Sequence, residues 1–346
     1  MPPIYVGTYA ESGGSGLQRL GFHATGELAC EDAFPGARNA SFGAYATRHD
    51  LHYLVDEHQA GTVGVFRRSG DDWQEVARVA TEGKDPCYVA LDTDEGMLAV
   101  ANYGNGTVAV FRLDPATGIP LDNPDILENA GHGPVRDRQG GPHAHCVRLG
   151  LDGTWLFHVD LGTDEILAYQ RDPATNRLGE RRVAFTAPAG SGPRHLVFHP
   201  TLPLAILVSE LASTLTVLRV EGGTLKAVHE VSTLPDGFTG DSIAGHLSLD
   251  RSGARIYVTN RGHDSVAVFD WVDGGAPRLL QHVPSGGASP RAFLLLEKER
   301  LFVLANEEGN SVTVFAVLDE GNLAAHHQTV AVPAPVFVFA GQSSPE

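Results

Sequence analysis

Two short motifs hold the densest group of chemically reactive side chains in the sequence: GPHAH at residues 141–145 and GPRH at residues 192–195. An imidazole exchanges its proton near neutral pH, and a guanidinium presents a fork of donors to a carboxylate or phosphate. The combination suits proton transfer beside a bound anion. A His-x-His spacing is also half of a metal site, but the sequence names no third or fourth ligand. We therefore predict neither a metal nor a cofactor.

The three cysteines, Cys30, Cys87 and Cys146, are far apart and lack the spacing of a zinc site or a disulfide framework. An odd number of cysteines without a pairing pattern fits a protein of the reducing cytoplasm. Cys146 directly follows His145, but adjacent residues on a strand point to opposite faces. We therefore expect no Cys–His nucleophile from that pair.

The elements that position these side chains follow from an internal repeat. An apolar strand, a small polar cluster and a second strand recur, as in LAVANYGNGTVAVF from Leu98 and IYVTNRGHDSVAVF from Ile256. The aligned polar residues of six copies, with steps of 46, 58, 49, 51 and 46 residues, are Asp56, Asn102, Asp160, Ser209, Asn260 and Asn306. A looser copy from Ile4 makes seven repeats of about 50 residues.

Each copy also carries an upstream strand, often introduced by proline, and a variable downstream strand. Four strands in each of seven repeats predict an all-β fold, a seven-bladed β-propeller that forms one domain over residues 1–346. The C-terminal APVFVFA matches the first strand of a repeat and the N-terminal IYVGTY matches the second. We therefore expect strands from both termini to close one blade. The longest stretch without strand character is residues 113–142, and loops of that length are usually functional or disordered.

Two aligned positions break the uniformity of the repeat. The first, within the inner strand, holds Ser41, Cys87, His145, Arg194, Gly245, Arg291 and Val336. The second, directly after the next strand, holds Glu57, Tyr103, Leu161, Glu210, Arg261 and Glu307. A purely structural position should hold one residue type in most copies. If both positions face one channel, their charged members form a concave binding site.

The aligned Asp and Asn residues have a simpler interpretation. Such side chains at a strand end cap the following turn, and a feature present in most repeats does not mark a single site. A calcium site built from these oxygen ligands is the alternative, although no compact acidic loop occurs.

Composition excludes several classes of protein. The chain has 346 residues, 40 of them glycine and 21 proline, which argues against a helix-rich fold. Its formal net charge of −17 makes nucleic acid an improbable partner. Apolar runs are too short to cross a bilayer, and the start, MPPIYVGTYA, shows no signal peptide. We expect a cytoplasmic protein without a membrane partner, as a monomer or weak homodimer.

The motifs together resemble a known family over nearly the whole chain. They are YVGTY, NASF, ANYGNGTVAVF, RQGGPHAH, DLGTDEI, GPRHLVFHP, SEL, TNRGHDSVAVF, SPRAF and ANEEGNSVTVF. The sequence is similar to the seven-bladed propeller lactonases, which include propeller-type 6-phosphogluconolactonases and the fungal carboxymuconate lactonizing enzyme.

The resemblance implies catalytic roles for a histidine, two arginines and a glutamate. The histidine corresponds to His145 or its neighbour His143, and the glutamate to Glu210. The arginines correspond to Arg194 and Arg291. The chain departs from the family at residues 209–211, where SEL replaces the usual Asn-Glu-Leu.

These residues predict hydrolysis of a small anionic sugar lactone, with 6-phosphogluconolactone as the first candidate. Glu210 or His145 would deprotonate water. Arg194 or Arg291 would stabilise the oxyanion, and the other, with Arg261, would hold the anionic tail. The predicted substrate-binding residues are His143, His195, Arg261 and Arg138, the last of which, with Gln139, matches a recurrent family feature. The alternatives are a carboxymuconate cycloisomerase and a non-enzymatic scaffold or sensing propeller.

Overall fold

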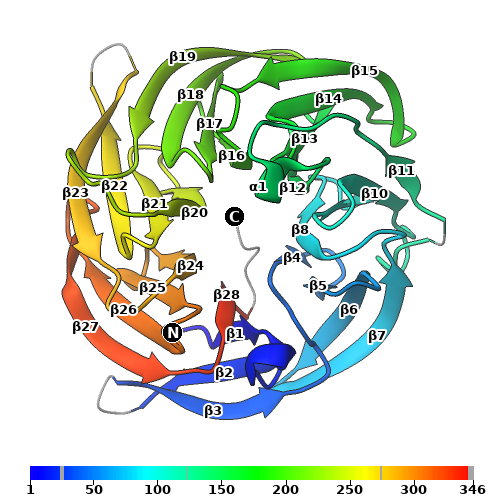
Figure 1. The fold of residues 1–346 in the computed structure, drawn as a ribbon. Coiled ribbons are helices and arrows are strands. Elements are labelled where there is room, and N and C mark those ends of the chain that lie inside the picture. Colours follow the sequence, from blue (N-terminus) through cyan, green and yellow to red (C-terminus); the bar gives the residue numbers. More distant parts are fainter. Residues whose placement is uncertain (24–26, 122, 273–274, 342–346) are drawn as a thin grey trace. The chain divides into compact units, whose positions relative to one another are not determined.

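The computed structural model describes residues 1–341 except 24–26, 122 and 273–274, and it describes the side chains of all these residues but 326 and 327. Within that part of the chain, 28 strands form seven four-stranded antiparallel sheets (Figure 1). The fold is a seven-bladed β-propeller, which confirms the prediction from the repeat.

Residue contacts divide the chain into two compact units. The terminal unit comprises residues 1–41 and 231–346, and the central unit comprises residues 42–230. Each is described by itself, and the prediction of a single domain stays a prediction.

Three sheets belong to the terminal unit. The first contains β28 (Pro335–Ala340), β1 (Ile4–Thr8), β2 (Leu17–Phe22) and β3 (Leu28–Phe34). The second contains β20 (Ile243–Leu249), β21 (Ile256–Arg261), β22 (Ser265–Trp271) and β23 (Pro277–Pro284). The third contains β24 (Pro290–Leu296), β25 (Leu301–Asn306), β26 (Ser311–Val317) and β27 (Leu323–Ala331). Pairing of β1 with β28 confirms that one blade takes strands from both termini, so β1 is paired on both sides and is not left as an edge strand.

Four sheets belong to the central unit. The first contains β4 (Gly43–Ala46), β5 (Leu51–Asp56), β6 (Thr62–Ser69) and β7 (Asp72–Ala80). The second contains β8 (Pro86–Leu91), β9 (Met97–Asn102), β10 (Thr107–Arg112) and β11 (Asp125–Leu127). The third contains β12 (Ala144–Leu149), β13 (Trp155–Asp160), β14 (Glu165–Asp172) and β15 (Arg177–Thr186). The fourth contains β16 (Pro193–Phe198), β17 (Leu204–Ser209), β18 (Thr214–Glu221) and β19 (Thr224–Ser232).

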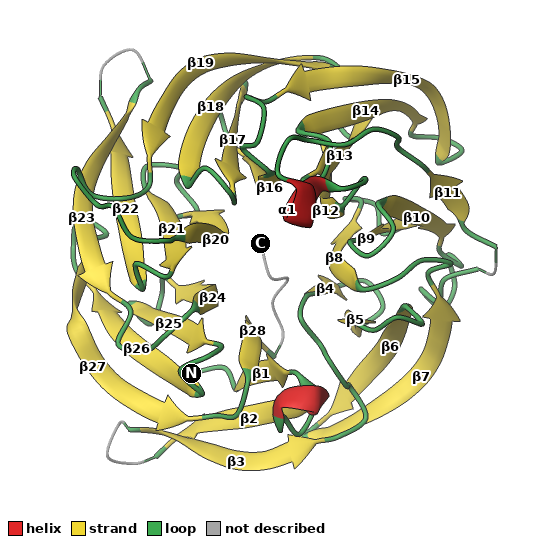
Figure 2. Cartoon of the chain, in the orientation of Figure 1, coloured by secondary structure: helices red, strands yellow, loops and turns green. Residues whose placement is uncertain are grey.

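Helical structure in the described residues is limited to two short pieces, drawn red in Figure 2. They are the 3₁₀ turn η1 (Ala10–Ser12) and the single-turn helix α1 (Arg136–Gln139). The expectation that residues 113–142 lack strand character is wrong for β11, which completes its sheet by pairing with β10. The described residues contain no helix long and apolar enough to cross a membrane.

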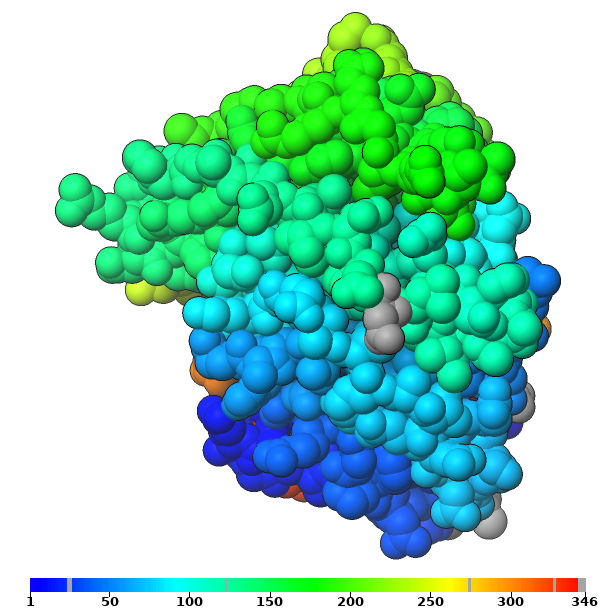
Figure 3. Space-filling view, turned by 90° about the vertical axis from the view of Figure 1, so that its right-hand side faces the viewer, coloured from blue at the N-terminus to red at the C-terminus, as the bar shows by residue number. Residues whose placement is uncertain are grey.

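The core lies between neighbouring sheets of a unit. Both faces of the middle strands are covered, so β9 is buried at every residue, and this explains the unbroken apolar runs of the repeat. In the terminal unit, for example, one buried cluster joins residues of β1, β2, β25, β26 and β28. The outer strands β7, β11 and β15 of the central unit are largely exposed and lie on the face shown in Figure 3.

Candidate active site

Five inner strands share a one-residue bulge at the aligned position. Pairing with the next strand skips one residue in each of β8, β12, β16, β24 and β28: Cys87, His145, Arg194, Arg291 and Val336. A bulge releases a side chain from the two-residue alternation of the strand and re-aims it. The sequence alignment therefore identified the positions at which the backbone changes the direction of a side chain.

A recurring backbone turn precedes most of these bulges. The residue before the first proline of the strand has a left-handed backbone: Asp85 (φ 49°), Gly192 (φ 63°), Ser289 (φ 58°) and Ala334 (φ 44°). Its carbonyl accepts a hydrogen bond from the residue that follows the next strand: Tyr103, Glu210, Glu307 and Tyr9, respectively. The turn thus brings the two mixed positions of each sheet together.

Glu210 is the centre of a buried charge cluster in the central unit. Its Oε2 accepts a hydrogen bond from Nε of Arg194 at 2.8 Å, and both side chains are only 3% exposed. Its Oε1 accepts a second hydrogen bond from Nη2 of Arg138. One carboxylate between two guanidinium groups leaves a fixed charge of plus one, so the cluster favours an anionic ligand.

His145 lies against this carboxylate. Its Nε2 is 3.8 Å from Oε2 of Glu210, and its side chain is 8% exposed. Its Nδ1 is 3.8 Å from Sγ of Cys87, the bulged residue of β8. The ring also meets the edges of Tyr103 and His195, with centroids 5.5 and 5.4 Å away. His145 is therefore held between an acid and a thiol.

Tyr103 contacts Arg138 and His143, two site residues that are more exposed than Glu210. Its hydroxyl accepts a hydrogen bond from Nη2 of Arg138 at 3.4 Å, and its ring stacks on His143 with centroids 4.5 Å apart. Nδ1 of His143 donates to the carbonyl of Tyr103 at 2.8 Å. Burial raises the pKa of Tyr103, although Arg138 opposes the increase. Burial disfavours the charge of Arg138, but Glu210 and Tyr103 more than offset this and raise its pKa.

Gln139 fixes the segment that carries Arg138. Its side chain is completely buried and donates to the carbonyl of Leu161 and to Oδ1 of Asp164, both at 2.8 Å. Its Oε1 accepts from the backbone of Val135. The Arg138 side chain, by contrast, is 36% exposed. A fixed backbone thus presents a guanidinium that solvent and a ligand reach.

His195 packs inside the same unit. It accepts a hydrogen bond on Nε2 from Nη1 of Arg194 at 3.0 Å, and its ring meets Tyr88 edge-on at 5.2 Å. The bulge at Arg194 explains how two adjacent residues contact each other. The central unit therefore brings together six of the eight predicted site residues: His143, His145, Arg194, His195, Glu210 and Arg138.

The remaining two, Arg291 and Arg261, belong to the terminal unit. Arg291 pairs with Oε2 of Glu307 at 3.2 Å and donates to the hydroxyl of Tyr9 at 2.6 Å. Nη2 of Arg261 donates to the carbonyl of Ala244 at 3.0 Å. The roles of both arginines in the site stay predictions.

The aligned Asp and Asn residues bind their own turns and strands. Oδ1 of Asp160 accepts backbone hydrogen bonds from residues 143, 162 and 163. The amide of Asn102 donates to Thr81 and Thr107, and that of Asn306 to Thr313. These contacts support the capping interpretation over calcium. No group of three or more His, Cys, Asp or Glu among the described residues has an arrangement suited to a metal.

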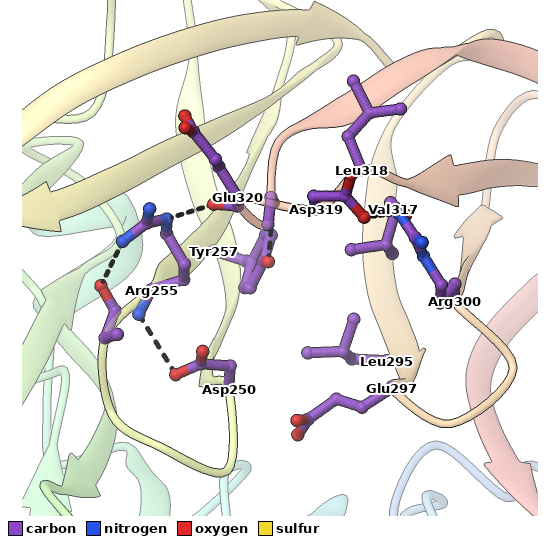
Figure 4. A pocket seen from close by; sticks show the side chains of 12 residues that line it. Asp250, Arg255, Tyr257, Leu295, Glu297, Arg300, Val317, Leu318, Asp319 and Glu320 are labelled. Atoms are coloured by element: carbon purple, nitrogen blue, oxygen red, sulfur yellow. Dashed lines mark hydrogen bonds and ion pairs between the residues drawn. The ribbon is translucent and has the colours of Figure 1, made fainter.

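Figure 4 shows a cavity of the terminal unit, with a volume of about 440 Å³. It is lined by residues of the β20–β21, β24–β25 and β26–β27 turns, including Arg255, Glu297 and Glu320. Arg291 lies near the start of β24, whereas this cavity lies at its other end. Tyr257 in its wall donates to the carbonyl of Gly321, as Tyr53 of the central unit does to Gly118. The hydrogen bond from a tyrosine to a carbonyl of the neighbouring sheet, found in the wall of this cavity, therefore recurs in the fold.

The sequence argument did not choose Cys87, Tyr103 and Tyr9, which contact predicted site residues. It named Gln139 only beside Arg138 and missed the hydrogen bonds that anchor it. Cys87 and Tyr103 occupied the two mixed aligned positions but were not chosen. Tyr9 follows β1 as Glu307 follows β25, and an alignment of the first copy at that point would have found it.

Comparisons with known proteins agree with this architecture. Residues 3–340 match the sequence model of the family described as "Lactonase, 7-bladed beta-propeller". A 6-phosphogluconolactonase of Bacillus subtilis is 29% identical over 96% of this chain and 97% of its own. A crystal structure of a Lactobacillus plantarum protein is 31% identical, with a TM-score of 0.89 over 97% of this chain and 98% of its own. A periplasmic gluconolactonase of Pseudomonas aeruginosa is 28% identical, with a TM-score of 0.88 over 98% of both chains.

The fold and these matches define an enzyme that hydrolyses lactones. The chain belongs to the family of seven-bladed β-propeller lactonases, as the motifs predicted.

Proposed function

We propose that the cluster around Glu210 is the catalytic site and that its substrate is an anionic sugar lactone, first of all 6-phosphogluconolactone. The observation that carries this proposal is the pairing of one carboxylate with Arg138 and Arg194 beside His145. Ester hydrolysis needs a base, a donor to the oxyanion and an anchor for the anionic tail, and the cluster supplies a group for each.

The hydrogen bonds favour His145 over Glu210 as the base. Both oxygens of Glu210 already accept charge-assisted hydrogen bonds from arginines, which stabilise the ionised carboxylate and make it a weaker base. His145 lies within 4 Å of that carboxylate, which stabilises the imidazolium formed when the ring takes a proton.

The two arginines differ in exposure, and this suggests different roles. Arg194 is buried beside the base, so we assign to it the stabilisation of the oxyanion. Arg138 is 36% exposed and is fixed by Gln139, so we assign to it the phosphate or carboxylate of the substrate. His143 and His195 support the cluster through Tyr103 and Arg194, respectively.

The choice of a phosphorylated lactone draws support from the Bacillus relative, which is a 6-phosphogluconolactonase. The Pseudomonas relative is named a gluconolactonase, without a phosphate in the name of its substrate. The test must therefore compare a phosphorylated lactone with an unphosphorylated one. Fresh 6-phosphogluconolactone and gluconolactone should be compared as substrates of the wild type and of Arg138→Met. We expect the variant to raise KM at least tenfold for the phosphorylated lactone and little for the neutral one. Equal changes for both substrates would contradict the role of Arg138.

Carboxymuconate cyclisation is the runner-up, because paired arginines also suit a dicarboxylate. The same preparation assayed on carboxymuconate decides between the two reactions.

Cytoplasmic location and a monomeric or weakly dimeric state are likewise proposals. Cell fractionation and sedimentation velocity test them.

A further inference from the structure

The thiol of Cys87 faces the ring nitrogen of His145 that points away from Glu210. Its Sγ lies 3.8 Å from Nδ1, whereas Nε2 lies 3.8 Å from Oε2 of Glu210. We propose that Cys87 is the nucleophile of lactone opening, with His145 as its base and Glu210 as the group that orients His145. This inference rests on the proposed function, because it assigns a covalent route to the same site.

The charges around Glu210 determine which nitrogen of His145 is basic. Arg138 and Arg194 keep Glu210 ionised, and an ionised carboxylate accepts but does not donate hydrogen bonds. Its position therefore favours a proton on Nε2 of His145. A neutral imidazole carries one proton, so the lone pair is on Nδ1 and points at the sulfur of Cys87. Nucleophile, base and orienting acid follow one another, as in a hydrolytic triad.

The resting state of Cys87 is a thiol. Besides His145 Nδ1, Sγ lies 3.6 Å from the carbonyl oxygens of Ala144 and His145, which accept a hydrogen bond from a thiol and repel a negative sulfur. The thiolate forms when His145 takes the proton. Cys87 thus depends on its base for reactivity.

The strand bulges explain why this thiol, and not Cys146, meets the imidazole. Cys87 and His145 are the bulged residues of β8 and β12, two inner strands that contact each other. Cys146 is fully buried one residue further along β12, where burial raises its pKa to about 11. The prediction that Cys146 and His145 form no nucleophilic pair agrees with this arrangement. Cys146 therefore serves as a comparison within the same protein: we expect its thiol to be unreactive.

The chemistry balances without a further reagent. The thiolate sulfur of Cys87 forms a bond to the lactone carbonyl carbon, and the ring C–O bond breaks. The proton held by His145 passes to the released ring oxygen, which leaves a hydroxy-acyl thioester. Water then attacks the thioester as His145 takes its proton, the C–S bond breaks, and the sulfur is protonated again. The products are the open-chain hydroxy acid, deprotonated at neutral pH, and the original thiol.

Substitution of Cys87 by serine and by alanine tests this role, with Cys30→Ser as the matched control at an exposed thiol. We expect Cys87→Ser and Cys87→Ala each to lower kcat for lactone opening more than 100-fold, while the control stays within twofold of wild type. Serine nearly matches the shape of cysteine but is a much weaker acid, so a packing or positioning role would survive that change. Retention of at least a third of wild-type kcat by either folded Cys87 variant would overturn the inference.

The intermediate gives a direct measurement in the Cys30→Ser background. Because the ring opens without losing a fragment, acid quench during turnover should trap the enzyme with the mass of one whole lactone added. Peptide mapping should place this mass on Cys87. An adduct on a residue other than Cys87 would refute the covalent route. The absence of any adduct during fast turnover at saturating lactone, together with an active Cys87→Ser variant, would also refute it.

Alkylation separates this inference from the proposed function. Iodoacetate should label Cys87 of the Cys30→Ser protein at least tenfold faster than Cys87 of the same protein carrying His145→Gln, because only the former has the base. If the wild type opens none of the tested lactones, the proposed function fails, and this comparison still tests the pair. Equal labelling rates would show that His145 does not activate Cys87 and would overturn the inference.

Discussion

The same Arg–Glu ion pair occurs in two sheets with different burial, and this allows a quantitative test of what holds the site together. Glu210 follows Arg194 by 16 residues, and Glu307 follows Arg291 by 16. The side chains of the first pair are both 3% exposed, whereas those of the second are 17% and 23% exposed. The two pairs thus differ clearly in burial; Glu210 also accepts a hydrogen bond from Arg138, and Arg291 also donates one to Tyr9.

We expect Glu210→Gln to lower the free energy of unfolding by about 3–5 kcal/mol, because it leaves the buried guanidinium of Arg194 without its counter-charge. Glu307→Gln should cost less than about 1 kcal/mol, because water screens and solvates the partly exposed Arg291. At roughly 2–4 °C per kcal/mol, the first variant should melt on the order of 10 °C below wild type. Urea unfolding followed by circular dichroism, together with calorimetry, measures both effects.

A second variant separates stability from catalysis. In Glu210→Gln with Arg194→Met, the uncompensated charge is replaced by an apolar side chain of similar length, so at least half of the lost stability should return. Lactone opening should not recover with stability, because the double variant also lacks the guanidinium assigned to the oxyanion. The reasoning would be refuted if the Glu307 variant lost as much stability as the Glu210 variant, or if the double variant were less stable than Glu210→Gln alone.

Further predictions concern turnover, the fixed loop and acid stability. Arg194→Ala should lower the catalysed rate of lactone opening, measured after subtraction of the spontaneous rate, at least 100-fold; unchanged turnover in a folded variant would remove Arg194 from the site. Arg291→Ala in the same assay tests the catalytic role predicted for Arg291. Gln139→Ala should destabilise by about 1–3 kcal/mol and speed limited proteolysis of residues 128–140, because it removes buried hydrogen bonds that hold them; an unchanged cleavage rate would contradict that anchoring. Burial lowers the pKa of His52 to about 4 and shifts that of His158 in the same direction. The unfolded chain therefore binds more protons below about pH 6.5, and each histidine should cost about 1.4 kcal/mol per unit as pH falls toward 4; His52→Phe should flatten the measured slope, and an unaltered slope would refute the assignment.

Most of the fold could be predicted from the sequence because the repeat carries its own evidence. Apolar strand pairs recur about every 50 residues, and the ends of the chain supply complementary halves of one blade. The short strand β11 escaped because it has only three residues, none of them buried, and its sheet holds them by backbone pairing with β10. An exposed outer strand leaves almost no pattern in the side chains.

The site was predicted only in part, for a reason of backbone geometry. Alternation with a period of two assigns Arg194 and His195 to opposite faces, yet the bulge lets them form a hydrogen bond. The alignment of repeats selected Arg194, His145 and Glu210 without knowledge of that bulge. Cys87 occupied the same aligned position, but only the charged residues and the histidine there were chosen, and the contact of its thiol with the imidazole could not be read from the sequence.

The bulges have a consequence for how such an enzyme changes over evolutionary time. A bulged residue lies outside the ladder of paired residues, so replacing its side chain leaves the backbone pairing of the sheet intact. One position in each of five sheets thus accepts residues as different as Cys, His, Arg and Val. A mutation there changes the reactive side chain without changing the hydrogen-bond ladder of the strand. A library randomised at these five codons alone would sample new substrate preferences on an unchanged scaffold.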